Sequence, residues 1–132
     1  MPPILKTREA EVYALMRIVV GFCFMWHGSQ KLLGVPGGAP GGAPAFVIYI
    51  AGPIELVGGL LIMIGFLTQW AAFVASGLMA FAYWLAHGTK ALLPIQNQGE
   101  MAVLYCFVFL FIAAKGAGIW SVDGPRGGRD WS

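Results

Sequence analysis

The side chains best suited to chemistry in this sequence stand inside or beside long apolar runs. They are His27, Gln30, Lys31, Glu55, His87 and Glu100. A histidine can take up and release a proton near neutral pH, and a carboxylate can serve as a proton acceptor. A lysine and an amide can donate hydrogen bonds to an oxygen atom of a ligand. Together these residue types suit the binding of a small oxygen-bearing molecule and the handling of its protons.

Two short motifs carry most of these residues. The first reads Trp26-His27-Gly28-Ser29-Gln30-Lys31, and the second reads His87-Gly88-Thr89-Lys90. Each motif ends an apolar run and is followed downstream by one acid, Glu55 or Glu100. The pattern fits either an internal duplication or a chance similarity over a few positions. In both cases it predicts one polar layer built from two parts.

Glu55 is the most informative of these residues. If its helix begins near Ala45, the carboxylate lies about 15 Å along the helix axis. A bare charge at that depth of a membrane is costly, so Glu55 must face inward and either pair with a cation or hold a proton. One interpretation is a proton acceptor beside a bound molecule, with His27 as the second catalytic candidate. The alternative is a structural ion pair with Lys31 or Arg17.

The residues around His27 allow the same two interpretations. His27 and Lys31 are four residues apart and therefore share one helix face. His27 could handle protons beside a ligand, or it could be an interior histidine bonded to a serine or a carboxylate. Gln30 could contact a quinone or another carbonyl compound, or it could be a rim residue in water.

Metal and haem sites are less favoured by the spacing. Histidine and glutamate suit zinc or iron, but metal sites in helix bundles usually use ligand pairs three residues apart, and none is present here. Haem ligation by His27 and His87 is supported by residue type alone. Cys23 and Cys106 stand in apolar runs without a CxxC motif, so we expect buried free thiols, with a disulfide left open. We therefore expect no metal and leave the cofactor undecided, with a quinone favoured over haem.

The composition excludes an ordinary soluble domain. Of the 132 residues, 58% are hydrophobic and 11% are charged, and the mean hydropathy is +0.75. Soluble domains carry about 25% charged residues. The net charge of +2 and the lack of a basic run also argue against nucleic-acid binding. We expect a single integral membrane domain in contact with lipid.

The apolar runs predict four membrane-spanning helices, because about 20 helical residues cross the hydrocarbon layer. The expected ranges are about 12–33, 45–66, 70–86 and 100–114. Residues 34–44 read as a linker of glycine and proline, which cannot propagate a helix. A tight turn is expected at 67–69, a polar loop at 87–99, and a glycine-rich charged tail at 117–132. The first run is too long for a cleaved signal peptide and contains Arg17.

The lysines and arginines predict the orientation. Six of them, in the two terminal segments and at Arg17, belong to one side, whereas Lys31 and Lys90 belong to the other. The side richer in lysine and arginine faces the cytoplasm. We therefore expect an all-α, antiparallel four-helix bundle with both termini cytoplasmic, and the polar layer in its outer half.

Several motifs in a fixed order resemble the DoxX family of small bacterial four-helix membrane proteins. The resemblance spans about residues 15–123. It rests on Arg17, Trp26-His27-Gly28-x-x-Lys31, Glu55-Leu56-Val57-Gly58-Gly59, Ala82 to Gly88, Gly99-Glu100, and Gly118-Ile119-Trp120-Ser121-Val122-Asp123. The family takes its name from the small subunit of a thiosulfate:quinone oxidoreductase, and other members are linked to redox stress defence. The resemblance singles out His27, Lys31, Glu55, His87 and Glu100 without assigning them roles.

These observations favour a multi-pass protein of the bacterial cytoplasmic membrane that belongs to a redox system. It would bind a quinone-like or small thiol-related ligand near the outer leaflet. Glu55 and His27 would handle protons, and Lys31 and Gln30 would polarise an oxygen atom of the ligand. The main alternative is a non-catalytic subunit of a larger membrane complex, and a small-solute transporter is a third. Other membrane-protein subunits, or further copies of this chain, are the expected partners.

Overall fold

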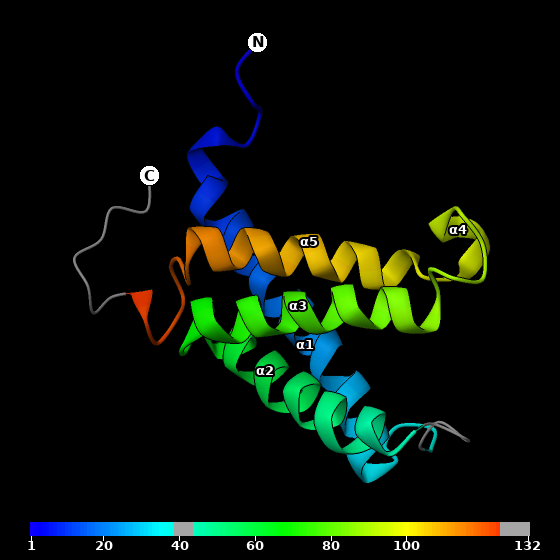
Figure 1. The fold of residues 1–132 in the computed structure, drawn as a ribbon. Helices are drawn as coiled ribbons and strands as arrows, with labels where there is room; N and C mark the ends of the chain where they lie inside the picture. Colours follow the sequence, from blue (N-terminus) through cyan, green and yellow to red (C-terminus); the bar gives the residue numbers. More distant parts are fainter. Residues whose placement is uncertain (39–43, 125–132) are drawn as a thin grey trace.

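The structure, a computed structural model, describes residues 1–38 and 44–124 (Figure 1). Within these residues every regular element is a helix. The elements are η1 (Lys6–Arg8), α1 (Glu9–Leu33), the π-helix η2 (Val47–Ala51), α2 (Gly52–Ile64), α3 (Thr68–Ala86), α4 (Pro94–Asn97) and α5 (Glu100–Lys115). The expected all-helical class is confirmed.

Three of the helical segments are long and apolar enough to cross a membrane. They are Lys6–Leu33, Val47–Ile64 and Thr68–Ala86. The fourth long helix, α5, has 16 residues and is about 24 Å long. The third helix begins at Thr68, so the turn expected at 67–69 lies earlier, around Gly65 and Leu67, whose backbones are left-handed. The loop expected at 87–99 also contains the short helix α4.

The helices form two antiparallel pairs that cross each other (Figure 1). Helix α1 lies along α2, and α3 lies along α5. Aromatic side chains join the two pairs in the core, where the ring centroid of Phe24 on α1 lies 4.6 Å from that of Phe109 and 5.2 Å from that of Tyr105 on α5. These three side chains are buried. Edge-on and tilted aromatic contacts between α1 and α5 therefore lie at the centre of the crossing.

Helices α1 and α2 touch backbone to backbone because glycines occupy their contact line. A Cβ atom added at Gly21 would lie 2.6 Å from the backbone nitrogen of Met63, and one at Gly59 would lie 2.6 Å from that of Met25. A Cβ at Gly28 would collide with the backbone of Leu56. Small residues permit this close approach of membrane helices, which lets dispersion forces act over the whole contact.

At the other end of the pairs, the segment after α5 folds back over the helix ends. Tyr13 donates a 2.6 Å hydrogen bond to the carbonyl of Gly116. Arg17 is fully buried and donates hydrogen bonds to the carbonyls of Ala117 (3.2 Å) and Trp120 (2.7 Å). Both α2 and α5 end here, and helix C-termini carry partial negative charge that favours a cation. Arg17 therefore fixes this segment, which we call the C-terminal clasp (residues 116–124), to α1.

The C-terminal clasp also caps the start of α3. The carboxylate of Asp123 accepts hydrogen bonds from the backbone N–H (3.1 Å) and the hydroxyl (3.3 Å) of Thr68. The backbone N–H of Asp123 donates to the carbonyl of Gly65 at 2.9 Å. Gly65 has a positive φ of 75° and lies against Ser121 and Arg17, so no larger residue fits. The C-terminal clasp thus holds the turn between the two helix pairs.

The structure tests the expected burial of the two cysteines and covers only part of the expected linker and tail. Cys23 and Cys106 are both free, but Cys23 is exposed and Cys106 is half-buried, so the expected burial of both thiols is wrong for Cys23. The side chain of Cys23 lies on the outer face of α1, where lipid can cover it. Part of the expected linker (39–43) and part of the expected tail, including Arg126 and Arg129, lie outside the described residues.

The glycine contact predicts a position-specific loss of stability. Gly28→Ala should lower the free energy of unfolding by about 1–3 kcal/mol, because the new methyl group forces α1 away from α2. Gly58→Ala is the matched control, since a Cβ at Gly58 meets nothing within 4 Å. Unfolding in a mild detergent measures both, and equal free energies for the two variants would refute the contact.

The C-terminal clasp predicts a large effect at Arg17. Arg17→Leu should lower the free energy of unfolding by about 1.5–3 kcal/mol, because hydrogen bonds from a charged group to two carbonyls are lost. Arg8→Leu removes the same charge from an exposed site and should change stability little. Thermal unfolding of the two variants measures both effects. Similar changes in unfolding temperature would show that the lost charge, rather than the lost contacts with the C-terminal clasp, lowers the stability.

Candidate functional site

Lys31 and Glu55 form a buried ion pair between α1 and α2. The Nζ atom of Lys31 lies 2.5 Å from Oε2 of Glu55, and the two side chains are 16% and 5% exposed. The close contact at Gly28 brings the helices together one turn earlier, so the lysine reaches the carboxylate. Arg17 contacts the C-terminal clasp instead. Of the two cations considered for Glu55, the structure therefore pairs it with Lys31.

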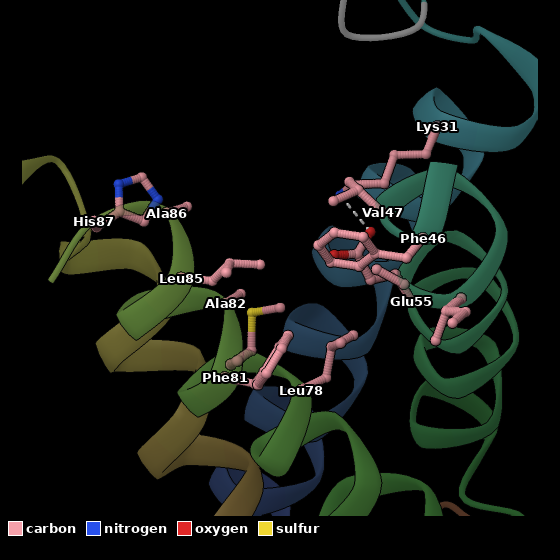
Figure 2. Close-up of a pocket in the computed structure, with 13 residues that line it drawn as sticks. Lys31, Phe46, Val47, Glu55, Leu78, Phe81, Ala82, Leu85, Ala86 and His87 are labelled. Atoms are coloured by element: carbon pink, nitrogen blue, oxygen red, sulfur yellow. Dashed lines mark hydrogen bonds and ion pairs between the residues drawn. The ribbon is translucent and has the colours of Figure 1, made fainter. Parts of the chain in front are cut away.

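The ion pair borders a cavity of about 540 Å³ between the two helix pairs. Figure 2 shows the two walls of the cavity. One wall is formed by η2 together with Lys31 of α1 and Glu55 of α2, and the other by the end of α3. Apart from three polar residues the lining is apolar. The lining residues are Lys31, Phe46, Val47, Ile50, Ala51, Glu55, Leu78, Met79, Phe81, Ala82, Leu85, Ala86 and His87. Such a cavity suits an apolar ligand with a few polar atoms at one end.

The first wall depends on an irregular helix. Pro53 lacks an N–H and its ring would clash with the carbonyl four residues earlier in a regular α-helix. The chain before it is a π-helix, η2, in which the N–H of Gly52 donates to the carbonyl of Val47, five residues back. Three residues of η2 (Val47, Ile50 and Ala51) line the cavity. Wide turns of this kind are frequent at functional sites.

His87 faces the ion pair from the opposite wall (Figure 2). Its Nδ1 atom lies 3.0 Å from the backbone carbonyl of Asn97, and a carbonyl can only accept, so Nδ1 carries the proton. In a neutral ring Nε2 is then free to accept a proton or a hydrogen bond. His87 is therefore oriented by a backbone contact and keeps one ring nitrogen for chemistry.

Asn97 organises the loop behind His87. Its amide nitrogen donates to the hydroxyl of Tyr83 (3.0 Å) and to the carbonyl of Ala91 (3.2 Å). Its side-chain oxygen accepts a 2.8 Å hydrogen bond from the N–H of Gly99. Asn97 is only 3% exposed, so the carbonyl that holds His87 has a fixed position. The sequence interpretation placed this residue in a polar loop and gave it no role.

The structure does not bring the other predicted site residues into the cavity. His27 is exposed and lies edge-on to Tyr105, with ring centroids 5.9 Å apart. Gly28, the next residue, faces α2. Successive side chains of a helix point about 100° apart, so His27 points away from α2. Gln30 donates instead to the carbonyl of Pro36 at 3.0 Å. Glu100 is exposed in the first turn of α5.

The expected polar layer is therefore smaller than predicted. Lys31, Glu55 and His87 share one cavity, whereas His27, Gln30 and Glu100 lie outside its lining. Within residues 1–38 and 44–124, no three side chains of histidine, cysteine, aspartate or glutamate gather as metal ligands would. The arrangement therefore presents an ammonium–carboxylate pair on one wall of an apolar cavity and an imidazole on the other.

Comparison with known proteins gives relatives that match most of the chain. An uncharacterized protein of Haemophilus influenzae is 40% identical over 116 residues, which are 83% of this chain and 87% of the relative. "Putative oxidoreductase CatD" of Bacillus subtilis is 28% identical over 113 residues, 83% of this chain and 82% of the relative. "Inner membrane protein YqjF" of Escherichia coli is 28% identical over 128 residues, 90% and 95% of the two chains.

No solved structure matches this chain. The sequence model of the DoxX family matches residues 12–88, more than half of the chain and the part that contains the first histidine motif, Glu55 and His87-Gly88. The resemblance predicted from those motifs is confirmed. This chain belongs to the DoxX family.

Proposed function

We propose that this protein belongs to a membrane redox system and binds a quinone-like ligand between the Lys31–Glu55 pair and His87. The observation that carries the proposal is a buried ion pair bordering an otherwise apolar cavity of about 540 Å³. Ionisable groups at membrane depth are costly and commonly mark ligand or proton pathways. The apolar lining favours a quinone over a small hydrophilic thiol.

The three polar groups have complementary roles in this proposal. The ammonium of Lys31 donates a hydrogen bond to one carbonyl oxygen of the ligand, which favours the more basic oxygen of the reduced form. Glu55 and His87 exchange protons with the ligand oxygens. Interconversion of a quinone and a quinol moves two electrons and two protons, and the proposal assigns only the binding and the protons to this chain. The chain's own contribution is binding and proton handling.

The relatives agree with this class of function. The Bacillus subtilis relative carries an oxidoreductase name, and the Escherichia coli relative is named an inner membrane protein. This likeness supports the proposal that the present chain belongs to a bacterial cytoplasmic membrane and takes part in redox chemistry. Its contact with lipid follows from the apolar helices.

We further propose that α1, η2 with α2, α3 and α5 all cross the membrane as a four-helix bundle. Lys6, Arg8 and Lys115 then lie on the same side as the C-terminal clasp, whereas Lys31 and Lys90 lie at the cavity end. The excess of cations at the clasp end argues for cytoplasmic termini. In that orientation the cavity opens in the outer half of the bundle, the half in which the sequence predicts the polar layer.

The ion pair gives a first test of ligand binding. Lys31→Met should weaken binding of a tailless dimethoxy-methyl-benzoquinone by about tenfold to a hundredfold, the value of a hydrogen bond to a charged donor. Glu55→Gln should change the affinity and its pH dependence, whereas Glu100→Gln and Lys90→Met serve as controls outside the cavity. Binding is measured with protein in lipid nanodiscs.

Stability must be separated from binding in this test. Removing one partner of a buried pair costs about 3–5 kcal/mol, so each single variant is expected to unfold more easily. The double variant Lys31→Met with Glu55→Gln has no unpaired charge and should regain most of the lost stability without regaining affinity. Unchanged affinity in the single and double variants would exclude a ligand at this pair.

The two histidines provide a second test, because sequence and structure rank them differently. His87→Ala should weaken quinone binding by about tenfold through loss of a hydrogen-bonding group. His27→Ala should leave affinity nearly unchanged, since His27 lies outside the cavity lining. The affinities of both variants are compared in the same nanodiscs. A larger loss of affinity in His27→Ala than in His87→Ala would indicate that the ligand binds instead at the face of α1 that contacts Tyr105.

A further inference from the structure

We infer that the ligand reaches this cavity sideways from the lipid, between η2 and α3, and carries an apolar tail that stays in that opening. The inference rests on the proposed quinone-like ligand and adds its route and its tail. Its starting point is the uneven distribution of polar groups around the cavity. Lys31, Glu55 and His87 are the only polar side chains among its lining residues.

The polar groups mark the head end of the cavity. Lys31 lies in the last turn of α1, and His87 immediately follows the last residue of α3. Figure 2 shows both at the same end, with the apolar side chains of Leu78 and Phe81 deeper between the helices. A ligand with one polar end therefore lies with its head toward the loops and its apolar part toward the middle of the membrane.

One side of the cavity is open at membrane depth. Four apolar side chains border it, which we call the lateral rim: Phe46 (39% exposed), Ile50 (57%), Phe81 (59%) and Leu85 (53%). Ile50, Phe81 and Leu85 belong to segments apolar enough to span a membrane. An exposed apolar side chain in such a segment faces acyl chains. The lateral rim therefore faces lipid, without a charged residue among its four members.

The inner side of the cavity is closed. Met79 is 7% exposed and Glu55 is 4% exposed, and both pack toward the other helices. A cavity of about 540 Å³ can enclose a substituted ring, but a long polyprenyl chain must leave it. Across the lateral rim such a chain passes directly into the hydrocarbon layer.

The apolar tail keeps the ligand in the bilayer but adds little to its affinity for the protein. Lipid chains are as apolar as the side chains of the lateral rim, so moving a tail from lipid to protein gains little free energy. A tail does keep the molecule in the membrane, with each buried methylene adding about 0.8 kcal/mol to partitioning. The head therefore meets the cavity at the high concentration found within the bilayer, and a blocked lateral rim should affect tailed ligands most.

The test compares two probes and two pairs of variants in lipid nanodiscs. The probes are ubiquinone with a long polyprenyl tail and its tailless dimethoxy-methyl-benzoquinone head. Ile50→Trp and Leu85→Trp narrow the lateral rim from its two walls. Tyr49→Trp and Phe73→Trp are the matched controls, because both residues are exposed on the same helical segments and neither lines the cavity. Unfolding temperatures confirm that all four variants keep the fold.

We expect Ile50→Trp and Leu85→Trp to weaken binding of the tailed probe about tenfold more than they weaken binding of the tailless probe, because only the tailed probe must keep its chain in the narrowed opening. The controls should bind both probes as the native chain does. Equal effects on both probes, or none on either, would overturn lateral access while leaving the proposed ligand site intact. Failure of the native chain to bind even the tailless probe would instead overturn the proposed function.

Discussion

The backbone contact between α1 and α2 is the constraint on which the rest of the structure depends. Gly21, Gly28 and Gly59 let the two helices approach until their main chains touch. At that separation Lys31 reaches across to Glu55, and a buried carboxylate gains the cation that it needs. With a side chain at Gly28 the helices would separate, and each charge would be left alone in an apolar environment. The ion pair therefore depends on the glycines, because only a close approach of the two helices lets Lys31 reach Glu55.

The second helix pair is held at the opposite end. Tyr13 and Arg17 fasten the C-terminal clasp to α1, and Asp123 fastens it to Gly65 after α2 and to the start of α3. An edge-on aromatic contact between Phe24 on α1 and Phe109 on α5 lies at the centre of the crossing. Because the two pairs are joined at one end and cross, they diverge at the other, and the cavity lies in that divergence (Figure 2). The fastened end confers rigidity, and the divergent end provides space for a ligand beside the ion pair.

The sequence predicts the helices well and the site only in part. The helical segments can be predicted because they depend on local composition: apolar runs form the helices, and the glycine–proline stretch separates two of them. The burial of Glu55 beside a cation also follows from the cost of a charge in a membrane. The rotation of each helix does not follow from the sequence. The four-residue spacing of His27 and Lys31 predicts one shared face, yet the contact at Gly28 turns only Lys31 toward Glu55. The π-helix before Pro53, and the hydrogen bonds of Asn97 that orient His87, depend on contacts that no local pattern specifies.

In the proposed complex a quinone-like head lies within hydrogen-bonding reach of Lys31 and beside Glu55. Solid-state NMR of the protein in lipid, with labelled lysine side-chain nitrogen and a quinone labelled at its carbonyl carbons, measures this proximity directly. We expect a dipolar coupling between the Lys31 Nζ and one carbonyl carbon, absent in Lys31→Met and present in Lys90→Met. A bound quinone whose carbonyl carbons couple to no lysine nitrogen, or whose coupling survives in Lys31→Met, would contradict it.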